Sequence, residues 1–259
     1  SVIQSPTIWI TDNWSCGYYH WMCDALSRLE MASQSHDLSA MTLLLPYKYR
    51  KHTYMQQSLK PFGLGEVRFL KRFERVLCHN LILPSHVAVS GNHSQPIIQR
   101  MHQRFAEYLA ATSAEDDSSV VSEFGDRVFI SRSMATRRRV ANEEAILPVL
   151  KRHGFTVFTA EKHDWRVQVQ VAAAAKYLVS NHGAGLTNMM MMSPRSRVLE
   201  IRDAVDPTPN CYFSLASASR LDYYYALAHR VDSEQCVHHG DVNVDPEQLD
   251  ATLAEMVAV

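Results

Sequence analysis

The sequence contains no hydrophobic run long enough to cross a bilayer, which takes about 20 helical residues. Its main apolar runs, at 41–46 and 171–179, are short, and the second contains Lys176. It also lacks an excess of charge of one sign, because 26 lysines and arginines face 27 carboxylates and the formal net charge is −1. A general binder of nucleic acid or acidic membranes normally has a basic excess, so any anion site in this chain must be local.

Cysteine pairing signals are missing as well. The five cysteines are scattered and form no CxxC pair, at Cys16, Cys23, Cys78, Cys211 and Cys236. This pattern is typical neither of a disulfide framework nor of a zinc ribbon, and favours free thiols in a reducing compartment. The thirteen histidines include no HExxH motif. We interpret Cys236, His238 and His239 as part of a surface loop, with zinc binding as the less favoured alternative.

Hydrophobic residues make up 46% and charged residues 20% of the chain, which predicts a folded globular protein. In the first half the patterns predict strands at 7–10, 41–46, 67–70 and 76–83, and helices at 14–35, 49–62 and 96–111. Residues 112–126 are rich in serine and acidic residues and end near Gly125, and we interpret them as a linker. The predicted domains are therefore residues 1–115 and 125–259.

The second half alternates strands with helices. We expect strands at 128–131, 156–159, 177–180, 197–201 and 223–227, and helices at 142–153, 165–175, 212–219 and 245–257, with another helix after Gly185. Repeated βα units predict a parallel sheet with helices on both faces. Ligands of such sheets bind at the carboxyl ends of the strands.

The segment from Tyr177 to Asn188 is the most informative. A short apolar strand leads directly into a turn of small residues, with the sequence His182, Gly183, Ala184, Gly185, Leu186, Thr187, Asn188. Glycines permit close backbone approach and positive φ, and the start of the following helix favours an anion. The alternative is a tight turn in which the glycines serve packing alone.

Charged residues at neighbouring strand ends support an anion site. Arg132 ends one predicted strand, and Arg137 to Arg139 precede the helix that Asn142 and Glu143 begin. Guanidinium groups match phosphate geometry. Glu200 ends the strand after the glycine turn, where a carboxylate can accept hydrogen bonds from ribose hydroxyls. The alternative is an ion pair between Glu200 and Arg202 or Arg197. Because no Walker lysine and no DxD pair is present, we predict a nucleotide-diphosphate site that needs no metal.

A helix in the first half carries a second candidate cluster. His20, Asp24 and Arg28 follow one another at spacings of four residues and are expected to share a face. A carboxylate facing a cleft can act as a general base that a neighbouring imidazole orients. The alternative is a surface helix in which Asp24 pairs with Arg28. The aromatic residues at 14, 18, 19 and 21 favour a sugar-binding cleft.

Three blocks of the sequence resemble glycosyltransferase family 61. Tyr18-Tyr19-His20-Trp21-Met22-Cys23-Asp24 is similar to its opening motif, and the segment from Ile130 to Glu144 to its central Arg and Arg-Asn-Glu-Glu motif. His182 to Asn188, with Glu200 after it, is similar to its third block.

This resemblance implies a GT-B-like α/β fold of two Rossmann-type domains with the active site in the cleft between them. Residues 1–115 would form the acceptor-side domain, and residues 125–259 the nucleotide-sugar-binding domain. The resemblance also implies an inverting, metal-independent transfer from a nucleotide-sugar to a hydroxyl of a glycan or polysaccharide, without a cofactor. Arg132, Arg139, Asn142, Glu143, Glu200 and the third block would hold the donor, with Asp24 as base and His20 beside it.

The family's bacterial members suggest a role in capsule polysaccharide synthesis. No secretory signal peptide opens the sequence, and the odd number of cysteines fits a reducing compartment. We therefore expect a cytoplasmic location, open to peripheral association with the inner face of the membrane. The alternative function is a non-catalytic nucleotide- or sugar-binding module of the same fold.

Overall fold

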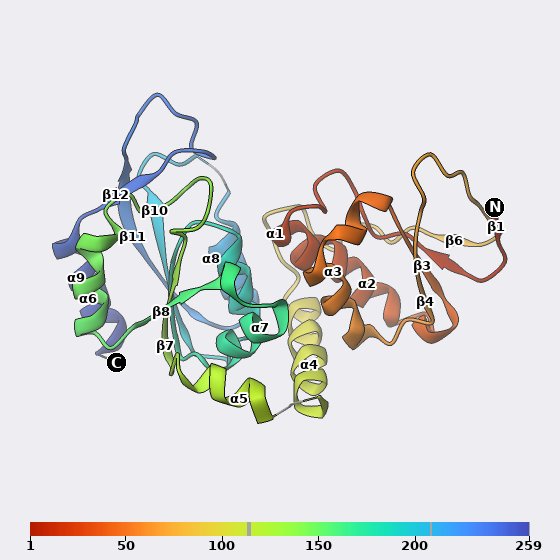
Figure 1. Ribbon diagram of the computed structural model, residues 1–259, viewed down its shortest axis with the longest axis horizontal. Helices are drawn as coiled ribbons and strands as arrows, with labels where there is room; N and C mark the ends of the chain where they lie inside the picture. The colour runs from red at the N-terminus through yellow and green to blue at the C-terminus, as the bar shows by residue number, and fades with distance from the viewer. Residues whose placement is uncertain (113–114, 208, 259) are drawn as a thin grey trace. The chain divides into compact units, whose positions relative to one another are not determined.

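A computed structural model describes residues 1–112, 115–207 and 209–258. The chain divides into two compact units, Ser1–Ala111 and Thr112–Val259 (Figure 1). Both are α/β units built on parallel sheets. Among the described residues no helix is long and apolar enough to span a membrane.

The first unit contains a four-stranded parallel sheet of order β4-β3-β2-β6. Its strands are β2 (Thr7–Ile8), β3 (Thr42–Leu45), β4 (Glu66–Phe69) and β6 (Leu81–Ile82). A separate ribbon pairs β1 (Val2–Ile3) with β5 (Leu77–Cys78). The strands predicted at 7–10, 41–46 and 67–70 are confirmed. The strand predicted at 76–83 is instead two strands that join different sheets.

The helices of this unit also follow the predicted pattern. The expected helix at 14–35 is α1 (Tyr18–His20), a π-helical turn (Trp21–Ala25) and α2 (Leu26–Ser33). The one at 49–62 is a 3₁₀ turn (Tyr47–Lys51), α3 (Thr53–Leu59) and a second 3₁₀ turn (Lys60–Phe62). The third is α4 (Gln95–Ala111), whose buried face includes Ile98, Met101 and Phe105. A further 3₁₀ turn, Leu38–Ala40, precedes β3.

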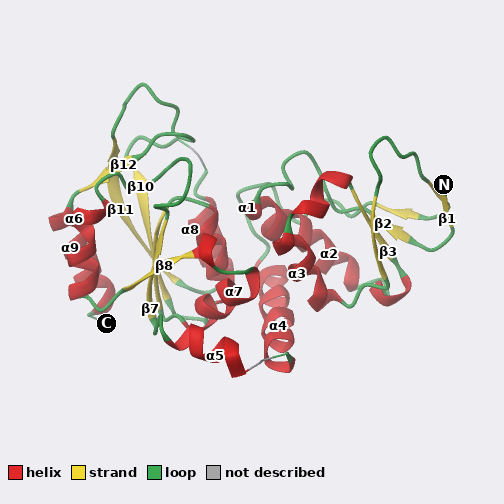
Figure 2. Ribbon diagram, in the orientation of Figure 1, coloured by secondary structure: helices red, strands yellow, loops and turns green. Residues whose placement is uncertain are grey.

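The second unit is built on a six-stranded sheet of order β12-β11-β10-β9-β7-β8. Its strands are β7 (Arg127–Ser131), β8 (Thr156–Thr159), β9 (Tyr177–Asn181), β10 (Arg197–Asp203), β11 (Asp222–Arg230) and β12 (Val242–Val244). All neighbours are parallel except β11 and β12. Helices α6 (Glu143–Arg152) and α9 (Pro246–Val257) cover one face, and α7 (Trp165–Ala174) and α8 (Cys211–Ala218) the other (Figure 2).

The strand order locates the ligand-binding edge of this sheet. The chain runs from β7 out to β8 and then returns past β7 to β9, so the direction of winding reverses between β7 and β9. In doubly wound sheets of this order, ligands bind outside the carboxyl ends of the strands at this switch point. Residues 131–132 and 181–182 lie at the ends of these two strands, where Ile130 is paired with Ser180.

Two expectations for this unit are wrong in detail, and one strand was not predicted. The predicted linker contains a helix, α5 (Glu115–Ser122), which contacts α7; residues 113–114 lie outside the described residues. Its polar composition resembles that of a linker, but the contact with α7 stabilises a helix. The segment after Gly183 is a 3₁₀ helix, Ala184–Met191, rather than an α-helix. The strand β12 was not predicted, because three residues are too few to show a period.

Candidate active site

Arg132 lies at the switch point of the second unit, directly after β7. Its guanidinium packs on the backbone of Gly183, so that a Cβ on that glycine would lie 2.4 Å from Nη1 of Arg132. Nε donates to the carbonyl of Arg138 at 2.9 Å and Nη2 to that of Arg137 at 3.1 Å. Burial lowers the pKa of Arg132, and the charge of Arg138 adds to this. Among the described residues no carboxylate forms an ion pair with Arg132, and two backbone carbonyls hold its guanidinium in place.

The two glycines of the turn serve different purposes. Gly183 has extended backbone, with φ of 168°, so it is needed for the close approach of Arg132 rather than for positive φ. A Cβ on Gly185 would lie 3.2 Å from Cγ2 of Ile130. The packing alternative therefore accounts for Gly185, whereas Gly183 shapes the arginine's position.

His182, Glu200 and Tyr223 form a hydrogen-bonded chain beside this turn. The Glu200 carboxylate is fully buried at the core of β10. It accepts from Nδ1 of His182 with one oxygen and from the hydroxyl of Tyr223 with the other. Burial and the charge of Glu200 raise the pKa of Tyr223, so that the phenol remains a donor. The predicted ribose contact of Glu200 is not favoured by this geometry, because neither carboxylate oxygen faces solvent.

The imidazole of His182 is the accessible end of that chain. Its side chain is 16% exposed and its ring contacts that of Tyr212 at 5.1 Å between centroids. Because Nδ1 is engaged by Glu200, Nε2 is the ring nitrogen left for a ligand. Of the rest of the turn, Ala184 is partly exposed, whereas Leu186, Thr187 and Asn188 are buried. Thr187 and Asn188, which the third block predicts as donor ligands, therefore have side chains that do not reach the surface.

The arginine loop is anchored to β12, a strand that the sequence pattern missed. Arg139 forms an ion pair with Asp241 at 2.7 Å, which raises the pKa of Arg139. The amide of Asn142 donates to the Val244 carbonyl at 2.7 Å and accepts from the Val244 N–H at 2.9 Å. Arg139 and Asn142, both predicted donor ligands, thus hold the loop on the sheet. Asp241 could not be identified from the sequence as the partner of Arg139, because the two residues are 102 positions apart.

Glu143, another predicted donor ligand, has a local partner. The hydroxyl of Ser131 donates to its carboxylate at 2.7 Å. This bond ties the start of α6 to the end of β7. Glu143 therefore supports the segment that precedes Arg132.

The first unit contains the second candidate cluster. Nδ1 of His20 lies 2.7 Å from Oδ2 of Asp24, whose side chain is 7% exposed, against 30% for His20. The hydroxyl of Ser90 reaches the same oxygen at 3.4 Å. The carboxylate therefore lies behind the imidazole, and His20 presents the more accessible polar atom.

Arg28 does not join this pair. It donates to the Ile10 carbonyl at 2.9 Å and pairs with Asp12. The expected shared face and the alternative Asp24–Arg28 ion pair are both wrong, because the π-helical turn at Trp21–Ala25 inserts a residue into the helical repeat and rotates the next turn of the helix. Burial raises the pKa of Asp12, but the hydrogen bonds from Arg28, Trp14 and Ser15 and the charge of Arg28 together outweigh burial and lower the pKa to about 2.

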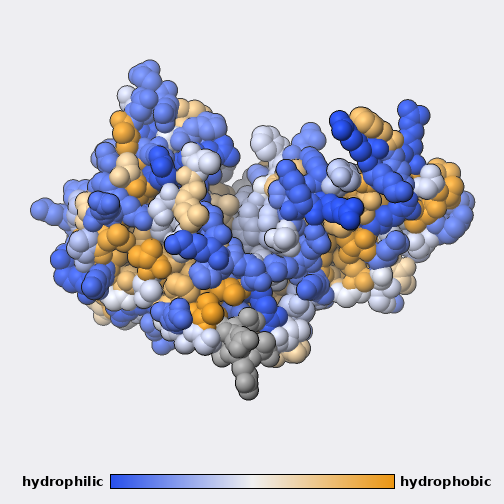
Figure 3. Space-filling model, viewed as in Figure 1, coloured by the Kyte–Doolittle hydropathy of each residue, from blue (hydrophilic) through white to orange (hydrophobic). Residues whose placement is uncertain are grey.

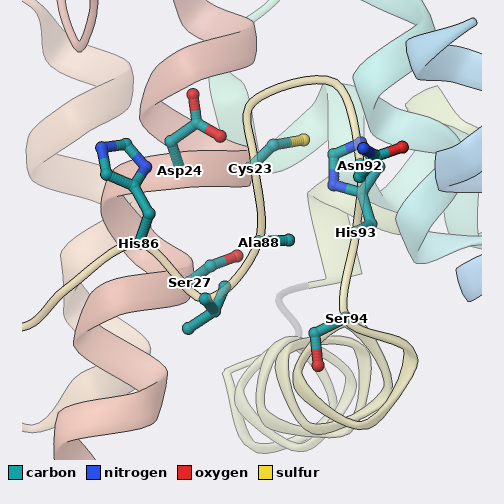
Figure 4. A pocket seen from close by; sticks show the side chains of 9 residues that line it. Cys23, Asp24, Ser27, His86, Ala88, Asn92, His93 and Ser94 are labelled. Carbon is teal, nitrogen blue, oxygen red and sulfur yellow. The ribbon is translucent and has the colours of Figure 1, made fainter.

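A small pocket opens beside Asp24 (Figure 4). The helix supplies Cys23, Asp24 and Ser27, and the loop before α4 supplies the rest of the lining, His86, Val87, Ala88, Asn92, His93 and Ser94. Nε2 of His93 also lies 3.1 Å from the hydroxyl of Tyr19. Sequence reasoning did not assign this loop to the site, although it carries two histidines.

The family model described as Glycosyltransferase 61 matches residues 18–199. This region includes the His20–Asp24 helix, Arg132 and the turn at His182. The chain belongs to glycosyltransferase family 61. The resemblance inferred from the three motif blocks is therefore confirmed.

Curated relatives of this family-61 chain are animal enzymes. It is 29% identical over 165 residues to protein O-linked-mannose β-1,4-N-acetylglucosaminyltransferase 2 of Takifugu rubripes, covering 61% of this chain and 28% of the relative. It is 23% identical over 239 residues to the EGF domain-specific O-linked N-acetylglucosamine transferase of Drosophila melanogaster, covering 86% of this chain and 45% of the relative. The chain thus spans less than half the length of either. These relatives do not support the expected link to bacterial capsules.

Proposed function

We propose that this family-61 chain transfers a sugar from a nucleotide-sugar to a hydroxyl group of a glycan or glycoprotein acceptor, with inversion at the anomeric carbon. The observation that carries the donor site is Arg132, a cation without a carboxylate partner among the described residues, at the switch point of a doubly wound sheet. The names of the two relatives support N-acetylglucosamine as the transferred sugar.

In this proposal the donor diphosphate binds against the turn after β9. Arg132 supplies charge and two-point hydrogen bonding that match a phosphate. Ala184 and Gly185 are partly exposed and lie at the start of the 3₁₀ helix, where N–H groups lack helical partners. Arg139 contributes to the position of the loop through its ion pair with Asp241.

His182 is proposed to contact the departing phosphate through Nε2. Its Nδ1 is held by Glu200, and Glu200 is held in turn by Tyr223. A carboxylate on one ring nitrogen fixes both the tautomer and the orientation of an imidazole. Glu200 is therefore assigned as a positioning residue for His182 rather than as a ribose ligand.

On the acceptor side we propose His20 as the general base and Asp24 as its orienting carboxylate. This reverses the roles expected from the sequence. The support is that Asp24 is nearly buried and lies on Nδ1, which leaves Nε2 of the more exposed His20 to take the acceptor proton. The GT-B-like cooperation of the two units and independence from metal ions are part of this proposal.

Calorimetry on Arg132→Ala tests the donor site. The affinities of the unaltered chain for uridine, guanosine and cytidine diphosphates are measured first. We then expect the affinity for the tightest-binding diphosphate to fall at least about tenfold in the variant. Arg152→Ala is the matched control, because Arg152 ends α6, at the opposite edge of the sheet, and pairs with Asp250 at the surface. If Arg132→Ala and the unaltered chain bound the diphosphate with equal affinity, the proposal that the donor binds at this turn would be wrong. Binding without turnover on any acceptor would favour the non-catalytic module.

A further inference from the structure

One edge of the first unit carries six cations, which we call the basic rim. Lys48, Arg50 and Lys51 lie in the 3₁₀ turn after β3, and Lys71, Arg72 and Arg75 in the loop after β4. Because β3 and β4 are parallel neighbours, with Leu45 paired to Phe69, the segments after these strands leave the sheet at the same edge. Both segments lie along the upper edge of this unit in Figure 1.

The basic rim keeps its charge within the part of the chain that the structure describes. All six residues are exposed, and among the described residues none of them forms an ion pair. The carboxylate of Glu74, in the same loop, forms no ion pair with any of the six side chains. It accepts from the Lys71 N–H at 2.8 Å and pairs with Arg68 at 2.6 Å. A chain with a net charge of −1 therefore holds a concentrated local excess of positive charge.

Apolar side chains project beside these cations. Phe73 is 89% exposed, at a φ of 62° that is unusual for an aromatic residue, and the guanidinium of Arg72 lies 5.0 Å from its ring centroid. Val2 and Leu77, paired across β1 and β5, are 51% and 63% exposed. Figure 3 shows hydrophilic side chains along this edge and hydrophobic ones at the adjoining end of the unit, near β1 and β6.

We propose that the basic rim and Phe73 dock this unit on an anionic lipid surface. Each unpaired cation near such a surface gains electrostatic attraction, and an aromatic ring beside them can enter the headgroup region. An acidic protein would be matched by the cations alone, whereas the exposed Phe73, Val2 and Leu77 also match the apolar boundary of a bilayer. This inference does not depend on the proposed transfer reaction.

Co-sedimentation with vesicles tests it. We expect the chain to sediment with vesicles of phosphatidylcholine mixed with phosphatidylserine, and not with phosphatidylcholine alone, and the bound fraction to fall as salt is raised. The triple variant Lys71→Glu/Arg72→Glu/Arg75→Glu should lose at least about tenfold in affinity. Phe73→Ser should weaken binding and leave its salt dependence unchanged.

The control is Arg100→Glu/Lys151→Glu/Lys176→Glu, which makes the same change in net charge at other exposed positions. Binding should survive in this variant, and circular dichroism should show that both triple variants remain folded. Equal loss in both would mean that net charge alone is responsible, and would overturn the assignment. The assignment would also be overturned if the chain were retained on an acidic polypeptide column but did not bind anionic vesicles.

Discussion

The carboxylate of Asp24 lies directly behind the imidazole of His20, with 2.7 Å between Oδ2 and Nδ1, and is the more buried of the two groups. The same relationship occurs in the second unit, where the buried Glu200 holds Nδ1 of His182. In each unit a histidine is therefore the accessible end of a carboxylate–imidazole pair. This arrangement leads to the proposed roles of His20 on the acceptor and His182 on the leaving group.

The first prediction concerns the base. His20→Ala should lower kcat by about 10²–10⁴-fold with the affinity for nucleotide diphosphate nearly unchanged, because no positioned base then takes the proton from the acceptor hydroxyl. Asp24→Asn should also lower kcat, since the wrong tautomer is favoured. The exposed His36→Ala is the control. An active His20→Ala variant together with an inactive Asp24→Asn variant would restore Asp24 as the base.

The second prediction concerns Glu200. Glu200→Gln and Tyr223→Phe should lower kcat more than they raise KM for the donor, because they loosen the orientation of His182 and leave Arg132 in place. Steady-state kinetics with calorimetry of the nucleotide diphosphate separates the two effects. If Glu200→Gln chiefly weakened nucleoside binding with kcat preserved, the ribose contact expected from the sequence would be correct instead.

The third prediction uses the glycine turn. Gly183→Ala should weaken diphosphate binding about as much as Arg132→Ala, because the new methyl group would occupy the place of the guanidinium. Its extended backbone accepts alanine, so the fold should remain. Gly185→Ala, which only presses on Ile130, is the matched comparison and should bind better than Gly183→Ala. The reverse ranking in calorimetry would place the ligand nearer Gly185.

The fourth prediction concerns metal ions. Since Arg132, His182 and the turn are proposed to balance the diphosphate charge, turnover should persist in excess EDTA. The release of nucleotide diphosphate can be followed with and without the chelator. Loss of activity that Mn²⁺ or Mg²⁺ restores would show that a metal takes part.

The fifth prediction concerns pH and stability. The pKa of Asp12 is lowered to about 2 in the folded chain, so its bond to Arg28 contributes fully above the unfolded value of about 3.9 and is lost as pH falls toward 2. Asp12→Asn should therefore lower the melting temperature at pH 7, and the difference from the unaltered chain should shrink between about pH 4 and pH 2. A difference that did not change over this range would contradict the assigned ion pair.

The sequence predicted those parts of the fold that depend on local pattern. The alternation of strands and helices and the turn at His182 were visible as short periodic or small-residue segments. The strand β12 was not, because its three residues are stabilised by pairing with β11 and by the bond between Asn142 and Val244. The second of these contacts joins residues 102 positions apart.

For the candidate site, too, the sequence predicted residue types but not the contacts that depend on the folded chain. The residue types at the strand ends pointed to Arg132, His182 and Glu200, but not to which of them face solvent. Burial of the Glu200 carboxylate depends on Tyr223, which comes from the neighbouring strand, β11. The π-helical turn separated Arg28 from Asp24, and a four-residue spacing cannot show such an insertion.

The backbone carbonyl of Arg138 accepts from both Nε of Arg132 and the side-chain amide of Asn181. One main-chain oxygen thus joins the ends of β7 and β9, and the left-handed conformation of Arg138, with φ of 54°, aims it there. Since every residue type carries that oxygen, the site should tolerate wide side-chain variation at position 138. Glycine or asparagine, which adopt positive φ readily, should fit best there, whereas proline, with φ fixed near about −65°, should not fit. Libraries that diversify this loop to alter donor preference can therefore include position 138 while Arg132 and Asn181 are kept.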